Sequence, residues 1–284
     1  MNLFHVVILA IVQGLAELLP VSSSAHVVVS EKLMGLDPTA PEMTLLLVML
    51  HTGTMFAVIV YFWKGWKRDY FASAGQTQWF AMQVLGATFC TGIVGYGLKI
   101  LIEKVFMRGA AHAEVEDLFS NLPLIAGALA AVGILIIYAG FHEDKTPRNS
   151  EIQPQHSFWI GVVQGLCLPF RGFSRSGATI STGLILGLPK QKLEEFSFAL
   201  AVVLTPPVIA QEAHRLVKAH ALSGQDSVMH LFVPGLVGMV FSFAAGLLAL
   251  KWLSRWLEGG RWKFFGFYCL LAAAGVLAIY YYKK

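Results

Sequence analysis

The sequence predicts an all-α polytopic membrane protein with six full transmembrane helices and two re-entrant helical hairpins in an inverted-topology repeat. Three observations lead to this prediction: the composition, six long apolar stretches, and two interrupted apolar regions that resemble each other. Of the 284 residues, 56% are hydrophobic and 13% are charged, whereas soluble domains carry about 25% charged residues. The mean hydropathy is +0.63. We therefore expect one membrane domain that covers residues 1–284.

Six stretches of the chain are predicted to cross a bilayer. A spanning helix needs about 20 mainly apolar residues. Six stretches meet this length, namely about 43–63, 79–101, 121–141, 195–215, 230–253 and 264–282. Several tryptophans and the tyrosine run at 280–282 lie near the predicted ends. Tryptophan and tyrosine are enriched at membrane–water interfaces, so their positions support these boundaries.

Two further apolar regions are interrupted and are predicted to be re-entrant hairpins. Residues 3–34 are broken by Pro20 and a run of serines, and residues 156–188 are broken by Pro169 and Gly172. Each half is about 10–15 residues long, which is too short to cross a bilayer. Irregular backbone is tolerated at membrane depth only where protein or a water-filled cavity surrounds it. We therefore expect both breaks to lie inside the protein.

The two hairpins predict an internal repeat. The string VQGL at residues 12–15 recurs at 163–166, and a proline and then serines follow each copy. Each hairpin precedes three predicted spans. Because three is an odd number, the second copy must enter the membrane from the opposite side, which places a shared site near the midplane. Repeat A would cover about 1–141 and repeat B about 156–284, joined by a cytoplasmic loop at 142–155.

Loop charges predict the orientation, because lysine and arginine gather in cytoplasmic loops. One side of the predicted topology carries ten such residues: Lys64, Lys67, Arg68, Lys145, Arg148, Lys190, Lys192, Arg255, Arg261 and Lys263. The other side carries six: Lys32, Lys104, Arg108, Lys218, Lys283 and Lys284. The first side is therefore predicted to be cytoplasmic, with both termini outside. Since these charges lie in short loops rather than in one stripe, no nucleic-acid partner is predicted.

One ionisable cluster lies within the first hairpin. Glu17 occupies an apolar helix, where a charged side chain costs at least about 2.5 kcal/mol on insertion scales and so indicates function. Gln13 lies one helical turn earlier on the same face. After Pro20 the chain adds three hydroxyl groups and an imidazole: Ser22, Ser23, Ser24 and His26. The alternative is that Glu17 is an interfacial cap and that the serines satisfy a broken helix.

A second polar cluster lies in the second hairpin. It comprises Arg171, Ser174, Arg175, Ser176, Gly177 and Thr179. The guanidinium of Arg175 carries a bidentate fork that suits phosphate, and a helix that begins near Ser176 would point free N–H groups at the same anion. Together the two clusters predict one phosphate-handling site. The alternative is a cytoplasmic loop with two snorkelling arginines.

His51 lies in the middle of the predicted span 43–63. A lone histidine in an apolar helix is more often packed and hydrogen-bonded than functional, and we interpret His51 in that way. The three cysteines, Cys90, Cys167 and Cys269, lie in apolar runs without metal-ligand spacing. We interpret them as small hydrophobic residues.

The segments QGLAELLPVSSSAH and GFSRSGATIS resemble the two signature segments of the bacterial undecaprenyl-diphosphate phosphatases, also known as bacitracin-resistance proteins. The resemblance runs over essentially the whole chain and includes HTGTMFAVIVYFWK and EFSFALAV. The family's Glu/Gln-x-x-x-Glu motif falls on Gln13 and Glu17, and its Ser-Ser-x-x-His string ends on His26. Its Gly-x-Ser-Arg-Ser-Gly-x-Thr motif falls on residues 172–179. The chain departs from the common pattern at three positions, with Gln13 for glutamate, Arg171 for proline and Ala25 for glycine.

This resemblance implies a polytopic enzyme of the bacterial inner (plasma) membrane, and the loop charges would place both of its termini in the periplasm. Such an enzyme removes the terminal phosphate of undecaprenyl diphosphate, a polyprenyl diphosphate lipid. It thereby recycles the carrier lipid for peptidoglycan synthesis and gives bacitracin resistance. The resemblance also implies a divalent metal, Mg²⁺ or Ca²⁺, with Glu17 as a ligand. A homodimer is an assembly that the sequence leaves open.

Phosphoanhydride hydrolysis needs neutralised phosphate charge and an in-line nucleophile. We predict four catalytic residues, Glu17, Ser23, His26 and Arg175. The predicted phosphate-binding residues are Gln13, Ser22, Ser24, Arg171, Ser174, Ser176, Gly177 and Thr179. Ser23, His26 and a metal-bound water are three alternatives for the nucleophile. Broken helices in an inverted repeat also fit a transporter or flippase of a phosphate-bearing lipid, which is the alternative function.

Overall fold

The computed structural model describes residues 2–36, 41–106, 121–142, 151–223 and 229–282, and within these ranges the chain is helical without a strand. The helices are α1 (Leu3–Leu18), α2 (Ser23–Leu33), α3 (Pro41–Asp69), α4 (Ala74–Leu101), α5 (Leu122–Phe141), α6 (Pro154–Cys167), α7 (Arg175–Ile185), α8 (Lys190–Ser223), α9 (Met229–Glu258) and α10 (Trp262–Tyr282). A short π-helical turn, η1 (Ile102–Phe106), extends α4. The all-α prediction is confirmed for the described residues.

Five helical segments of the described chain are long and apolar enough to cross a membrane: Leu45–Asp69, Ala74–Lys104, Leu122–Phe141, Val233–Glu258 and Trp262–Tyr282. The chain is therefore a multi-pass membrane protein. The predicted span 195–215 lies inside the continuous helix α8 but is not among these five. Most of the predicted loop 142–155 lies outside the described residues, as do Arg108, Lys145, Arg148, Lys283 and Lys284.

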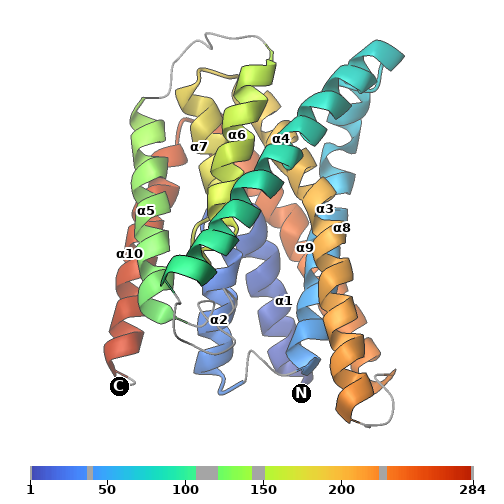
Figure 1. The fold of residues 1–284 in the computed structure, drawn as a ribbon, viewed down its shortest axis with the longest axis vertical. Coiled ribbons are helices and arrows are strands. Elements are labelled where there is room, and N and C mark those ends of the chain that lie inside the picture. The colour runs from blue at the N-terminus through green and yellow to red at the C-terminus, as the bar shows by residue number, and fades with distance from the viewer. Residues whose placement is uncertain (1, 37–40, 107–120, 143–150, 224–228, 283–284) are drawn as a thin grey trace.

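Two pairs of short helices stand out, α1 with α2 and α6 with α7. Pro20 explains the end of α1, because the residue before a proline is pushed out of the helical region; Leu19 is extended, with φ −83° and ψ 152°. Pro169 also lies just after the end of α6, although Leu168 before it keeps helical angles, with φ −60° and ψ −45°. The pair α1 and α2 occupies the half of the molecule that holds both chain ends, and α6 and α7 occupy the opposite half (Figure 1). The first connecting turn (residues 19–22) and the second (residues 168–174) therefore point toward the middle of the protein.

Glycines hold both helix pairs against long helices. A Cβ at Gly14 of α1 would lie 2.6 Å from the Ser242 carbonyl oxygen of α9. A Cβ at Gly161 of α6 would lie 2.4 Å from the Ala87 carbonyl oxygen of α4. Small residues permit such close backbone approach in membrane proteins. Any larger side chain at these positions would push the hairpins away from the helices that support them.

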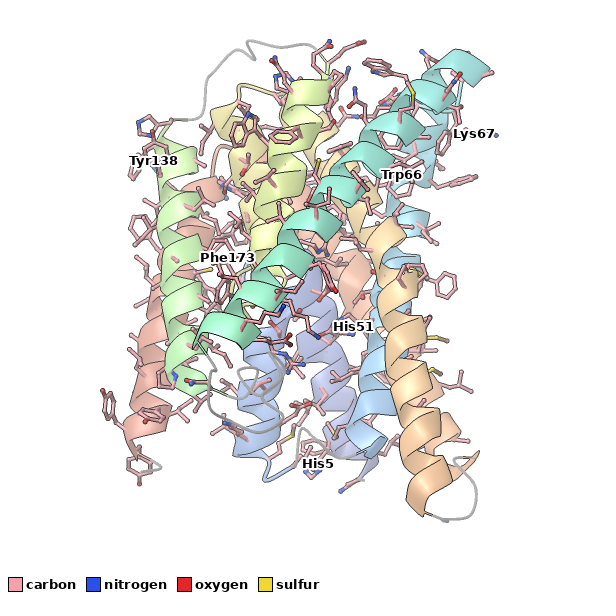
Figure 2. All side chains as sticks on the ribbon, in the orientation of Figure 1. His5, His51, Trp66, Lys67, Tyr138 and Phe173 are labelled. Atoms are coloured by element: carbon pink, nitrogen blue, oxygen red, sulfur yellow. The ribbon has the colours of Figure 1, made fainter. Side chains whose placement is uncertain are left out.

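Helices α2, α5 and α10 share an apolar cluster that supports the first turn from one side. Its buried members are Ala25, Val28, Leu122, Ile125, Ala126, Leu129, Ala273 and Val276. On another side, α3 and α9 pack closely, since a Cβ at Gly53 would lie 2.3 Å from the Met239 carbonyl oxygen. His51 of α3 and Phe173 of the second turn lie at mid-height of the molecule (Figure 2). The polar clusters predicted from the sequence thus come together at the centre of the fold.

Candidate active site

Each connecting turn contacts the helix that follows the other turn. The Gly172 backbone N–H donates to Ser24 Oγ at 3.4 Å. The Ser176 hydroxyl donates to the Leu19 carbonyl oxygen at 3.3 Å. Gly172 has a φ of +103°, and a Cβ there would lie 2.4 Å from the Ile125 carbonyl oxygen of α5. Only glycine fits this position without strain, so the second turn can sit close to both α5 and the first turn.

Glu17, in the last turn of α1, joins the polar groups of both hairpins. Its Oε1 accepts from Arg175 Nη2 at 3.3 Å. Its Oε2 accepts from Gln13 Nε2 at 3.2 Å and from the Ser23 hydroxyl. The side chains of Glu17 and Arg175 are 18% and 19% exposed. Because the pair is largely shielded from solvent, its charges interact more strongly than a surface pair would.

The start of α7 is built to receive an anion. Ser174 caps this helix, since its Oγ accepts from the Gly177 backbone N–H at 3.2 Å. The first backbone N–H groups of a helix have no partner within it, and they carry the positive end of the helix dipole. Arg175 adds a guanidinium at the same point, and within the described part of the chain its Nη1 is buried without a hydrogen-bond partner. A buried donor without a partner is costly unless a ligand satisfies it.

A cavity of about 270 Å³ lies where the two turns meet. Polar residues from both turns line it, namely Glu17, Ser22, Ser23, Ser24, Arg171, Ser174, Arg175 and Ser176. Apolar residues complete the wall, among them Leu168, Phe170 and Phe173. The cavity therefore offers two guanidinium groups, one carboxylate and several hydroxyl groups beside an apolar surface. This combination suits the charged head group of a lipid.

Four predicted site residues lie outside the set that lines this cavity in the described structure: Gln13, His26, Gly177 and Thr179. The Thr179 hydroxyl donates to the Arg175 carbonyl oxygen at 2.9 Å and lies 2.6 Å from Ser197 Oγ. Gly177 takes part in the α7 cap. His26 turns toward α10, where its Nε2 lies 2.7 Å from the Tyr268 hydroxyl. Gln13 reaches the site through its hydrogen bond to Glu17.

A comparison with protein-family models shows to which family this chain belongs. The family model described as "Bacitracin resistance protein BacA" matches residues 6–275. The chain belongs to this family. The match covers both hairpins and all five candidate spans up to residue 275 of α10, so the family resemblance inferred from the two signature segments is confirmed.

Relatives of this BacA family member carry a consistent name. "Undecaprenyl-diphosphatase 2" of Acinetobacter baylyi is 59% identical over 282 residues, which is 98% of each chain. "Undecaprenyl-diphosphatase" of Bacteroides fragilis is 31% identical over 290 residues, again 98% of each chain. "Undecaprenyl-diphosphatase" of Caldicellulosiruptor bescii is 32% identical over 295 residues, which is 99% of this chain and 98% of the relative.

His51 is a site residue that sequence reasoning assigned only to packing in this BacA family member. Its Nδ1–H donates to the Leu47 carbonyl oxygen at 2.8 Å, as expected for a packed histidine. However, it also lines the cavity, and its Nε2 lies 3.8 Å from Glu17 Oε2. The position of His51 halfway along an apolar span was the available signal, because polar groups at that depth tend to be functional.

The BacA family resemblance implies a divalent metal, for which the cavity offers few protein ligands. Glu17 is the one carboxylate among the described residues that line the cavity, and no group of three His, Cys, Asp or Glu side chains in the described chain could hold a metal ion. Mg²⁺ is commonly bound by one or two carboxylates together with substrate phosphates. The residues present therefore fit a cation that Glu17 and the phosphates of a substrate hold jointly.

Proposed function

We propose that this BacA family member hydrolyses undecaprenyl diphosphate to undecaprenyl phosphate and inorganic phosphate in the bacterial inner membrane. This reaction recycles the carrier lipid for peptidoglycan synthesis and gives bacitracin resistance. The observation that carries the proposal is the Glu17–Arg175 pair, which joins α1 to α7 at 3.3 Å and leaves Arg175 Nη1 buried without a partner among the described residues. The names of the relatives support the same substrate.

The terminal phosphate would bind at the start of α7. Arg175 Nη1 and the first backbone N–H groups of α7 would donate to its oxygens, which is how helix N-termini and arginines hold phosphate. Arg171 lies in the wall of the same cavity and would neutralise further negative charge of the diphosphate. The apolar wall at Leu168, Phe170 and Phe173 would lie against the beginning of the polyprenyl chain.

The contacts favour Ser23 over His26 as the nucleophile. The Ser23 hydroxyl already donates to Glu17 Oε2, so Glu17 is placed to take its proton. Ser23 Oγ would attack the terminal phosphorus and form a new O–P bond. The bond between that phosphorus and the bridging oxygen would break, and its electron pair would leave with the lipid monophosphate, whose freed oxygen would accept the proton from Glu17. Water, deprotonated by Glu17, would then attack the phosphoserine, which releases inorganic phosphate and restores the Ser23 hydroxyl.

We also propose that Mg²⁺ or Ca²⁺ assists the reaction, with Glu17 as the protein ligand. When bound, a divalent cation would supply further neutralisation of negative charge on the phosphates. Arg175 would still orient the terminal phosphate, and the hydrogen bond from Gln13 would hold the Glu17 carboxylate in place. Protein and substrate would therefore share the ligands of the cation.

We expect the purified protein in detergent to release inorganic phosphate from undecaprenyl diphosphate, and excess chelator to stop this release until Mg²⁺ or Ca²⁺ is added back. Detergent solution has no two sides, so a pure transporter would release no phosphate there. The measurement is colorimetric phosphate release, with undecaprenyl phosphate as a control substrate that lacks the anhydride. Absence of release from the diphosphate would contradict the proposed activity, whereas full activity in chelator would remove only the metal.

The helix arrangement supports an inverted-topology repeat. Helices α1 and α6 lie in opposite halves (Figure 1), and each packs through a glycine against a long helix, α1 against α9 and α6 against α4. Exchanging each helix of one repeat for its counterpart in the other converts the first contact into the second. We propose that the end of the molecule with Lys67 and Tyr138 (Figure 2) is cytoplasmic, because the described residues of the predicted ten-charge side lie there.

A topology reporter would test this orientation. We expect a reporter fused after residue 284 to be periplasmic and a tag in the loop 142–155 to be cytoplasmic. The physical reason is the excess of lysine and arginine on the side of that loop. Paired alkaline phosphatase and fluorescent-protein fusions at both positions are the measurement. Finding both positions on the same side of the membrane would be incompatible with an inverted repeat.

A further inference from the structure

Both ring nitrogens of His26 are engaged away from the cavity. Its Nδ1–H donates to the Ser22 carbonyl oxygen at 2.7 Å. Its Nε2 lies 2.7 Å from the Tyr268 hydroxyl, and the two rings are stacked with an interplanar angle of 11°. Since a carbonyl oxygen can only accept, Nδ1 carries the proton, and Nε2 of the neutral ring accepts from the tyrosine. Tyr268 belongs to α10, which is 242 residues away in the chain.

The carbonyl that His26 holds belongs to a strained residue. Ser22 has a φ of +66° and is the one non-glycine residue with positive φ in the described chain. Such a conformation persists only where surrounding contacts hold it. Ser22 directly precedes Ser23, whose hydroxyl donates to Glu17. The direction in which Ser23 points is therefore set by the backbone of Ser22.

A second contact from α10 supports the same turn. The Cys269 thiol donates to the Pro20 carbonyl oxygen at 3.4 Å. Consecutive residues of α10, Tyr268 and Cys269, thus secure the turn on either side of Val21. Both contacts reach the turn from the opposite repeat, so the geometry at Ser23 depends on how α10 is seated.

We propose that Tyr268 is a positioning residue of the proposed phosphatase reaction, which acts through His26. The Tyr268 hydroxyl fixes the imidazole ring, the ring's Nδ1–H holds the Ser22 carbonyl, and the held turn aims Ser23 at Glu17. This inference rests on the proposed function. It assigns His26 a positioning role and gives α10 a part in the site that the signature segments do not contain.

The test measures turnover in detergent for variants that each change a single hydrogen bond. Tyr268→Phe removes only the hydroxyl, and we expect kcat to fall roughly three- to tenfold, as for one lost hydrogen bond, while KM stays within about twofold. Tyr282→Phe is the matched control, because Tyr282 is 93% exposed on the same helix. It should leave kcat unchanged. Equal kcat in Tyr268→Phe and the wild type would overturn the proposal.

Two substitutions of His26 separate positioning from chemistry. Asparagine places an amide N–H near the position of Nδ1, whereas glutamine places it nearer to Nε2. We expect His26→Asn to keep at least about a tenth of wild-type kcat, in line with a weakened hydrogen bond, and His26→Gln to lose clearly more. If Nε2 attacked phosphorus or carried the proton, both variants would be equally inactive and the proposal would fail.

A double variant and a spectrum complete the test. Adding Tyr268→Phe to His26→Asn should cause no further loss of kcat, because His26→Asn has already removed the ring nitrogen that Tyr268 contacts. If the two losses of kcat multiply, Tyr268 does not act through His26. Independently of turnover, ¹⁵N-histidine NMR should show the Nδ1–H tautomer at His26 and a shifted Nε2 signal in Tyr268→Phe. An inactive wild type would reject the proposed function, but the NMR signals would still decide this inference.

Discussion

Arg175→Lys is expected to lower kcat for undecaprenyl diphosphate about 10²–10³-fold, the usual cost of losing one preorganised donor to developing charge. The two terminal nitrogen atoms of the planar Arg175 guanidinium have different roles. Nη2 contacts Glu17 at 3.3 Å, and Nη1 is buried with no partner in the residues that the structure describes. A lysine keeps the positive charge but offers a single ammonium group that cannot do both. Steady-state phosphate release measures the loss, and the exposed Arg255 supplies the matched control Arg255→Lys, which should be neutral.

The same contact makes a second variant informative. Glu17→Gln should also be severe, because Glu17 is the one carboxylate among the described residues lining the cavity. Groups that act on one phosphate in one transition state are strongly non-additive. We therefore expect the double variant to be little worse than the poorer single variant. If the two losses multiply, or if Arg175→Lys remains active, the two hairpins do not serve one phosphate.

Ser23→Ala is expected to lower kcat by roughly 10⁴-fold or more, the scale seen when a covalent nucleophile is removed. Ser23 lines the cavity, and its hydroxyl donates to Glu17, so it has both the cavity position and an adjacent proton acceptor. The measurement is phosphate release, together with acid-quench trapping of a phosphoenzyme from substrate labelled in the terminal phosphate. The wild type should show a labelled protein, and Ser23→Ala should not.

Ser24→Ala is the matched control for this prediction. Ser24 also lines the cavity, but its hydroxyl contacts Ser22 Oγ at 3.2 Å and accepts from Gly172 N–H rather than approaching Glu17. Its loss should cost no more than about tenfold, as for one hydrogen bond. A Ser23→Ala enzyme within tenfold of the wild type would exclude the covalent route and leave a metal-bound water as the nucleophile.

Apolar patterns predicted the middle of a helix better than its ends. The span predicted at 43–63 lies inside α3, which extends from Pro41 to Asp69. The additional residues at its end include Trp66, Lys67 and Arg68, which lie beyond the apolar run that sequence reasoning counted. Such amphipathic side chains belong at the interface. The helix therefore continues past the point where its apolar stretch stops.

In the site, too, the sequence predicted some residues correctly, and only the structure placed the others. Placing Glu17, Ser23 and Arg175 in one site followed from polar groups inside apolar segments and from the family resemblance, and the structure brings these three together. His26 was predicted to be catalytic, and the structure places it on Tyr268 and the Ser22 carbonyl instead of in the cavity wall. His51 was assigned to packing, and the structure places it beside Glu17. The direction of each ring depends on neighbouring helices, which a local pattern does not contain.

By itself, the sequence determined the membrane class, the two broken hairpins and the residue types available for phosphate chemistry. These properties are local: apolar length sets which segments can span a membrane, and Pro20 and Pro169 lie just beyond the ends of α1 and α6, where proline is common. Only the tertiary structure decided that Glu17 meets Arg175 across 158 residues and that α10 secures the turn before Ser23. These contacts depend on how closely the helices pack. Gly14, Gly161 and Gly172 permit this packing, because a Cβ atom at any of these positions would lie only 2.4–2.6 Å from a backbone oxygen of a neighbouring helix.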